Sequence, residues 1–130
     1  MGYRSEVVLV VGKEVMPQFM VTMAKCREAR ELCFAANDRM IKDYGDEKGS
    51  FLFSWDWLKW YDSYPCVAAL TDFMDWCDDA KIPPEEDTDR LRTEDGIYFY
   101  RFVRIGEENE DNVVRGWGFD DVNIERKITF

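Results

Sequence analysis

Residues 51–77 read FLFSWDWLKWYDSYPCVAALTDFMDWC and predict a β-strand that continues into an amphipathic helix. In residues 51–61, alternate side chains fall on opposite faces of the strand. One face carries Phe51, Phe53, Trp55 and Trp57, and the other carries Leu52, Ser54, Asp56, Leu58 and Trp60. Both faces are apolar toward the end of the strand, so we expect a bulge near Leu58 or Lys59 to shift its register.

The second half of this stretch predicts a helix. Asp62 or Ser63 can cap its start, and Pro65 is tolerated in a first helical turn. The helical period separates a buried arc, formed by Cys66, Leu70, Phe73 and Cys77, from an acidic face, formed by Asp72, Asp75, Asp78 and Asp79. Trp76 lies at the flank of the arc, where it either completes the core or stands at its rim.

A strand and a helix are expected before this stretch. Residues 3–11 are apolar on both faces and predict a buried central strand. Residues 13–37 predict one helix, with Pro17 in its first turn and an apolar stripe of Phe19, Met23, Cys26, Cys33 and Phe34. Arg30 interrupts the stripe, either as an inward anion anchor or as a side chain whose stem packs while its charged end reaches water or a carboxylate.

Three further strands are expected after it. Residues 82–95 form a charged loop with paired prolines, residues 96–105 a central strand, and residues 113–117 and 122–130 two shorter strands. Polar alternate positions mark residues 122–130 as an edge strand. The predicted order is β-α-β-α-β-β-β, an α+β fold in which two helices pack on one face of a mainly antiparallel sheet. We expect a single domain over residues 1–130, as a monomer or as a dimer paired through that edge strand.

The charge of the chain is one-sided. The formal net charge is −10, and residues 1–50 hold eight basic and eight acidic side chains, so the entire excess follows residue 50. Such a field repels phosphate backbones and anionic lipids and favours a protein partner with a basic surface. Alternatively, the acidity only keeps a small aromatic-rich protein soluble.

Several classes of chemistry lack their usual residues. The chain has no histidine, which removes the commonest general base and metal ligand. Its cysteines, Cys26, Cys33, Cys66 and Cys77, lack zinc-knuckle spacing, and no glycine-rich phosphate loop is present. The first ten residues lack the basic region and apolar run expected of a signal peptide, and no apolar stretch approaches membrane-spanning length. We therefore expect a cytoplasmic protein with reduced cysteines, no metal, no cofactor and no enzymatic activity.

Two candidate sites follow from the aromatic and charged residues. The first is a contact surface for a basic protein, made by Asp72, Asp75, Asp78 and Asp79 together with Trp55, Trp57, Trp60 and Trp76. The second is a pocket for a signalling nucleotide, in which tryptophans and Tyr61 stack on a ring while Arg30, Arg101 or Arg104 neutralise its phosphates. A third alternative is a DNA mimic built from the carboxylates, against which the neutral charge of the first 50 residues counts.

Three stretches carry a resemblance. Residues 1–7 (MGYRSEV), 58–65 (LKWYDSYP) and 102–108 (FVRIGEE) are similar to segments of small phage and prophage proteins of unassigned function. The chain departs from their pattern in its Pro83-Pro84 loop and in Cys66, where an acidic residue is expected. The resemblance implies an infected bacterial cytoplasm and supplies no catalytic residues. By analogy with small acidic phage inhibitors, it implies a protein that blocks a host component such as a CRISPR or other defence factor.

Overall fold

An antiparallel sheet with helices on one face organises the chain. The computed structural model describes residues 4–13, 15–35, 37–44, 48–78, 100–107, 111–117, 122–124 and 128–129. The elements are β1 (Ser5–Val11), α1 (Met16–Lys25), α2 (Arg27–Phe34), β2 (Arg39–Lys42), β3 (Phe51–Leu58), α3 (Pro65–Asp78), β4 (Tyr100–Gly106), β5 (Asn112–Trp117), β6 (Asn123–Ile124) and β7 (Ile128–Thr129). The predicted α+β class and mainly antiparallel sheet are confirmed.

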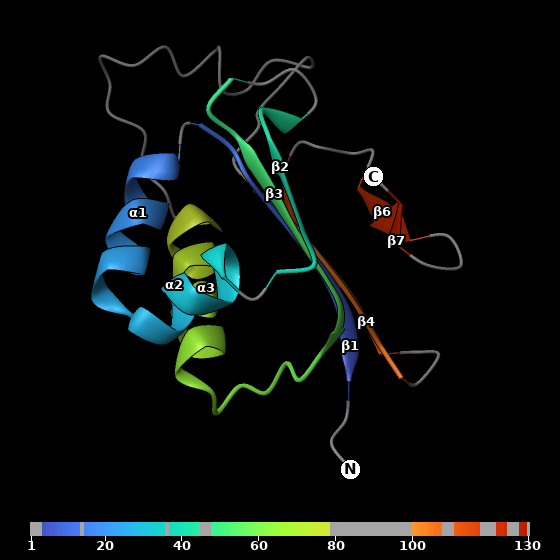
Figure 1. The fold of residues 1–130 in the computed structure, drawn as a ribbon. Coiled ribbons are helices and arrows are strands. Elements are labelled where there is room, and N and C mark those ends of the chain that lie inside the picture. Colours follow the sequence, from blue (N-terminus) through green and yellow to red (C-terminus); the bar gives the residue numbers. More distant parts are fainter. Residues whose placement is uncertain are drawn as a thin grey trace.

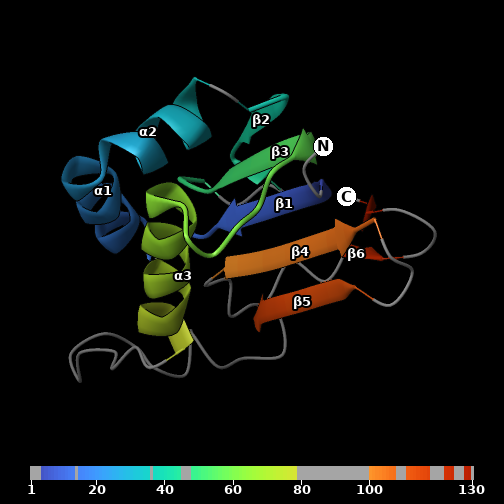
Figure 2. The same cartoon turned by 90° about the horizontal axis from the view of Figure 1, so that it is seen from below.

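The described strands of the main sheet lie in the order β2-β3-β1-β4-β5, with every neighbouring pair antiparallel (Figure 2). The helices cover one face, and the short pair β6 and β7 lies on the other (Figure 1). The predicted central strand is confirmed, because β1 pairs with β3 on one side and β4 on the other. Its valines and Leu9 are buried on both faces, as a central strand between two layers requires.

The helix-side core fills the space between the sheet and the helices. Phe19 of α1 lies at its centre, with ring centroids 5.7 Å from Phe53 of β3 and 5.3 Å from Phe73 of α3. Its buried members are Val7, Leu9, Val11, Val15, Phe19, Met23, Ala29, Leu32, Cys33, Phe53, Trp55, Leu70, Phe73, Met74, Cys77, Tyr100 and Phe102. Aromatic rings from three elements therefore hold the helices to the sheet.

A smaller core lies on the back face of the sheet, and it overturns the prediction for residues 122–130. Its buried members are Val8, Val10, Leu52, Val103 and Val122. Within residues 122–130, the described parts form β6 and β7, which contact β1 and β4 instead of extending the sheet. They pack there because the back face of β1 and β4 is apolar, and its removal from water is favourable. The described edge strands are β2 and β5, so the predicted dimer edge is not an edge of this sheet.

The helix predicted for residues 13–37 is divided at Cys26, so three described helices replace the predicted two. Cys26 has an extended backbone, with φ −128° and ψ 104°. The break leaves carbonyl groups at the end of α1 without helical donors. The Arg30 guanidinium donates to one of them, with 3.2 Å from Nη1 to the Met23 oxygen. Arg30 is thus exposed and caps α1, so it is not an inward anion anchor.

Strand β3 contains the expected bulge slightly earlier than predicted. Val7 pairs with Trp55 and Ser5 pairs with Leu58, so β3 has one extra residue between these two pairs. The extra residue returns Leu58 to the helix side, where it packs against the helix-side core. Trp57 lies inside the bulge and is 64% exposed.

Candidate functional site

Trp55 does not belong to the predicted contact surface. It is only 1% exposed and packs in the helix-side core. Its indole Nε1 donates a hydrogen bond to the Leu32 carbonyl at 3.1 Å. The prediction was wrong because alternation alone cannot tell a covered face from an open one, and here α2 covers Trp55. Trp57 is the most exposed large hydrophobic residue described, but it belongs to the bulge of β3 and not to a helix.

The outer face of α3 retains part of the predicted surface. Asp72, Asp75 and Trp76 are exposed on neighbouring turns, while Leu70, Phe73 and Cys77 are buried, as predicted. We call Asp72, Asp75 and Trp76 the α3 ridge. Trp76 is 43% exposed, so it stands at the rim of the core. The side chain of Asp78, the last residue of α3, and the whole of Asp79 lie outside the described residues.

A groove between α1 and α3 borders the ridge on one side. This α1–α3 groove has a volume of about 310 Å³. It is lined by Gln18, Val21, Thr22, Lys25, Cys26, Ala69, Asp72, Phe73 and Trp76. Across the groove from Trp76, α1 exposes Val21 at 41%. The ridge and α1 therefore offer apolar surface next to an open carboxylate.

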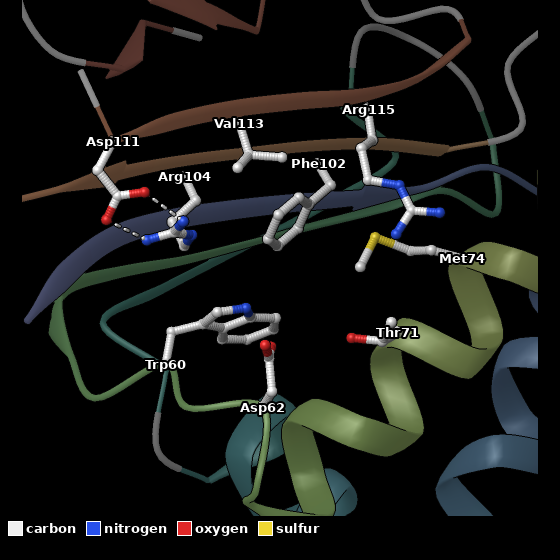
Figure 3. A pocket seen from close by; sticks show the side chains of 9 residues that line it. All are labelled: Trp60, Asp62, Thr71, Met74, Phe102, Arg104, Asp111, Val113 and Arg115. Atoms are coloured by element: carbon white, nitrogen blue, oxygen red, sulfur yellow. Dashed lines mark hydrogen bonds and ion pairs between the residues drawn. The ribbon is translucent and has the colours of Figure 1, made fainter.

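A larger cavity borders the ridge on its other side, between α3, the hairpin β4–β5 and the segment that follows β3 (Figure 3). This Trp60 cavity has a volume of about 450 Å³. It is lined by Trp60, Asp62, Thr71, Met74, Phe102, Arg104, Asp111, Val113 and Arg115. Buried Met74 and Phe102 supply apolar lining, and the Trp60 ring lies 5.3 Å from that of Phe102, measured between centroids.

Both arginines of the cavity hold carboxylates. Arg104 binds Asp111 through two contacts, 2.6 Å from Nη2 to Oδ1 and 3.1 Å from Nη1 to Oδ2. Arg104 Nη1 also donates to the Ser5 hydroxyl at 3.2 Å. Arg115 Nη2 lies 3.0 Å from Asp75 Oδ1, which ties the hairpin to the α3 ridge. A forked pair such as Arg104–Asp111 fixes a rigid, locally neutral wall.

Two other polar groups of the cavity are not engaged in this way. The carboxylate of Asp62 and the hydroxyl of Thr71 point into the cavity beside the Trp60 ring (Figure 3). Within the part of the chain that the structure describes, neither side chain has a hydrogen-bond or ion-pair partner. The open polar groups of the cavity are therefore acceptor-rich and carry one negative charge.

The predicted nucleotide pocket is not assembled. Arg30 caps α1, and Arg101 lies on the back face of the sheet, where its Nε donates to the Val122 carbonyl at 3.1 Å. Tyr61 packs on Tyr64, with ring centroids 5.1 Å apart. Of the four predicted ligand residues, Arg104 alone lines the Trp60 cavity. The three arginines do not converge on one pocket. Arg101 and Arg104 lie three positions apart in β4, so their side chains point to opposite faces of the sheet, and Arg30 lies on a helix.

Sequence reasoning missed Asp62, Thr71, Asp111 and Arg115 as cavity residues. Strand parity offered a signal, because Phe102 pairs with Arg115 and Arg104 pairs with Val113, which places all four side chains on one face. Residues from three separate stretches of the chain, Ser5, Trp60 and Arg104, also meet here. No spacing rule brings Thr71 of α3 to these residues, since that contact depends on how α3 packs.

Cys33 and Cys66 do not lie in surroundings that activate a thiol. Burial raises the pKa of the Cys33 thiol, and the nearby Cys66 adds to the rise. Desolvation also raises the pKa of Cys66, although backbone hydrogen bonds oppose the rise. A raised pKa reduces the thiolate fraction, which is the nucleophilic form. Among the described residues, no three Cys, Asp or Glu side chains are placed to share a metal ion.

No protein-family model, curated protein or solved structure matches this chain. Among the described helices, none has the length and apolar character needed to cross a membrane. The α3 ridge, the α1–α3 groove and the Trp60 cavity are the features from which a function has to be argued.

Proposed function

We propose that the chain is a non-enzymatic binding protein that attaches to a partner protein with a basic surface and blocks it. The observation that carries this proposal is the α3 ridge, where Trp76 is exposed beside Asp72 and Asp75 and above the α1–α3 groove. An exposed indole at the edge of a groove supplies contact area at low entropic cost. Neighbouring carboxylates orient and attract a basic partner.

The net charge and the exposed face of α1 support this reading. A charge of −10 speeds the approach of a basic protein over long distances and disfavours anionic partners. Val21 extends the apolar surface from Trp76 across the groove. Together they give the arrangement typical of an interface, an apolar centre with charged groups at its rim.

The resemblance to phage and prophage proteins extends the proposal to the kind of partner. We place the protein in the cytoplasm of an infected bacterium and its partner among host proteins, in particular nucleic-acid-binding components of CRISPR or other defence systems. Such effectors present basic surfaces that bind phosphate backbones. If the α3 ridge bound over such a surface, it would inhibit the effector by covering it, without catalysing a reaction.

The test is affinity capture from host lysate with matched variants. Asp72→Lys and Trp76→Ala are expected to reduce capture of the partner at least tenfold, because each removes a central contact of the ridge. Asp56→Lys makes the same charge change on β3, and Trp57→Ala removes an exposed indole away from the helices, so both are expected to retain capture. Equal capture by all four variants and the wild type would refute the ridge as the binding face.

A further inference from the structure

The charged residues of the Trp60 cavity determine which class of ligand can bind there. Arg104 and Arg115 lie on its wall, but Asp111 and Asp75 already hold them in ion pairs at 2.6 Å and 3.0 Å. The side chain of Arg104 is only 16% exposed, so its pair with Asp111 is largely shielded from solvent. An anion entering the cavity would have to displace these carboxylates and meet the charge of Asp62. The cavity is therefore poorly suited to phosphate groups.

The groups left open favour a cation. The Asp62 carboxylate, the Thr71 hydroxyl and the Trp60 indole face the same space (Figure 3). A carboxylate accepts two parallel hydrogen bonds from a guanidinium group, and an indole ring attracts a cation placed over its face. A hydroxyl accepts a further hydrogen bond. These are the partners that a planar, monovalent cation with several N–H donors needs.

The apolar lining of the cavity suits a side chain with a hydrocarbon stem. Met74 and Phe102 are nearly fully buried and contribute apolar atoms to the wall, together with Val113. The volume of about 450 Å³ accommodates an extended side chain with part of its backbone. Arginine carries both a three-carbon stem and the planar fork, whereas the compact ammonium of lysine cannot make the bidentate contact.

We infer that the Trp60 cavity receives an arginine side chain of the basic partner protein. This inference rests on the proposed function and specifies the partner's chemistry at one point of the interface. The guanidinium donates two hydrogen bonds to Asp62, stacks on Trp60 and donates to Thr71. The stem lies against Met74, Phe102 and Val113. Because the cavity and the α1–α3 groove flank the same ridge, one partner surface can occupy both.

The test uses a model ligand and the full chain, without the partner. N-acetyl-arginine amide is titrated into isotopically labelled protein while the indole N–H resonance of Trp60 is followed, with the assignment taken from Trp60→Phe. We expect saturable shifts of that resonance. The isosteric but neutral N-acetyl-citrulline amide is expected to give none, and N-acetyl-lysine amide a weaker response, since it lacks the planar fork. Shifts of equal size with citrulline would overturn the inference.

A charge variant and its matched control sharpen this test. Asp62→Asn keeps the shape of an exposed side chain and is expected to weaken binding of the arginine amide about fivefold, the loss of about 1 kcal/mol for a partly exposed ion pair. Asp56→Asn removes the same charge outside the cavity and is expected to leave binding unchanged. An undiminished affinity of Asp62→Asn, or a Trp60 response to adenosine monophosphate with none to arginine, would overturn the inference.

The two proposals fail separately. A silent Trp60 resonance, with partner capture still dependent on Asp72 and Trp76, removes the arginine site and leaves the ridge. A Trp60 response to arginine with capture independent of the ridge removes the proposed binding face and leaves an arginine-binding cavity.

Discussion

Trp55 and Trp57 show how one extra residue in a strand separates two identical side chains. They lie two positions apart in β3, which in a regular strand would place both on the helix side. The bulge between Trp55 and Leu58 breaks this alternation. Trp55 is 1% exposed and bound to the Leu32 carbonyl, whereas Trp57 is 64% exposed. The first indole stabilises the fold, and the second is open to solvent.

This pair yields a prediction for stability. Trp55→Phe is expected to lower the free energy of unfolding by about 2–3 kcal/mol, because it leaves a void and removes the buried hydrogen bond to the Leu32 carbonyl. Trp57→Phe makes the same replacement at an exposed site and is expected to change that free energy by less than about 0.5 kcal/mol. Urea unfolding of the two variants and the wild type measures both. Equal effects would contradict the burial of Trp55.

Cys33 gives a prediction for pH. Its thiol has a pKa raised by burial above the ordinary value of 9.0, so the folded state retains its proton at a pH where the unfolded chain releases it. The stabilisation by Cys33 is therefore complete below pH 9.0 and decreases above it. We expect a loss of about 1.4 kcal/mol in the free energy of unfolding by one pH unit above the unfolded pKa.

The measurement compares reduced wild type with Cys33→Ala by urea unfolding near pH 8 and pH 10. Cys33→Ala is expected to be less stable at both values, because it leaves a void in the helix-side core, but to lose less stability as the pH rises. Groups that do not interact with Cys33 titrate equally in both proteins, so the difference between the two pH dependences belongs to Cys33 and its interaction with Cys66. Identical pH dependences would contradict the prediction.

At the scale of elements, the hairpin β4–β5 depends on one glycine. Gly116 has φ +103° and pairs with Arg101 where the Tyr100 carbonyl comes close to its Cα. A Cβ at this position would overlap the Tyr100 oxygen. Such a contact with backbone cannot be relieved by a side-chain rotation, so only glycine fits. The hairpin carries Arg104 and Arg115, and its geometry therefore shapes the Trp60 cavity.

We predict that Gly116→Ala lowers the free energy of unfolding by about 3 kcal/mol or more, through the steric contact and the positive φ together. Val114→Thr is the control on the same strand, because Val114 is 44% exposed and Thr keeps the branched Cβ. The control is expected to change stability by less than about 0.5 kcal/mol. Urea unfolding distinguishes the two, and a Gly116→Ala protein as stable as the control would refute the assigned backbone geometry.

The long, strongly patterned elements were predictable, and the short ones were not. The apolar run of β1 predicts a buried strand, and the apolar arc of α3 predicts an amphipathic helix, with no competing interpretation for either. The break at Cys26 left no such signal, since the residues on both sides favour helix and Arg30 supplies the cap from seven positions away. Strand β2 was missed because it is four residues long and mostly exposed, so it shows little alternation.

The candidate site was predicted in part for the same reason. The helical period placed Asp72 and Asp75 outside, and the structure agrees. It left Trp76 either in the core or at its rim, and the structure places Trp76 at the rim. The Trp60 cavity requires α3, β4, β5 and residues 59–64 to meet, and such a meeting depends on tertiary packing. Local periodicity predicts which residues of an element are buried, but it does not predict which other element packs against them.

At the scale of the whole molecule, the described elements form three layers, namely the helices, the main sheet, and the pair β6 and β7. The helices and the front of the sheet enclose the larger core, while β6, β7 and Val122 cover the back. The α3 ridge lies in the helical layer, between a groove on one side and a cavity on the other. The acidic excess follows residue 50, so it belongs to the part of the chain that includes this helix. Shape and charge therefore point to the same face of the helical layer.

The central position of β1 also sets the order in which the protein can form during synthesis. β1 leaves the ribosome first, but its partners are Phe51–Leu58 and Tyr100–Gly106. At about 5–20 residues per second, the second partner follows roughly 5–20 s later. Throughout that interval the most apolar strand has at least one unpaired edge, at which it can join another nascent chain. We therefore expect the yield of folded protein to depend on chaperones and on the rate of translation more than its small size suggests.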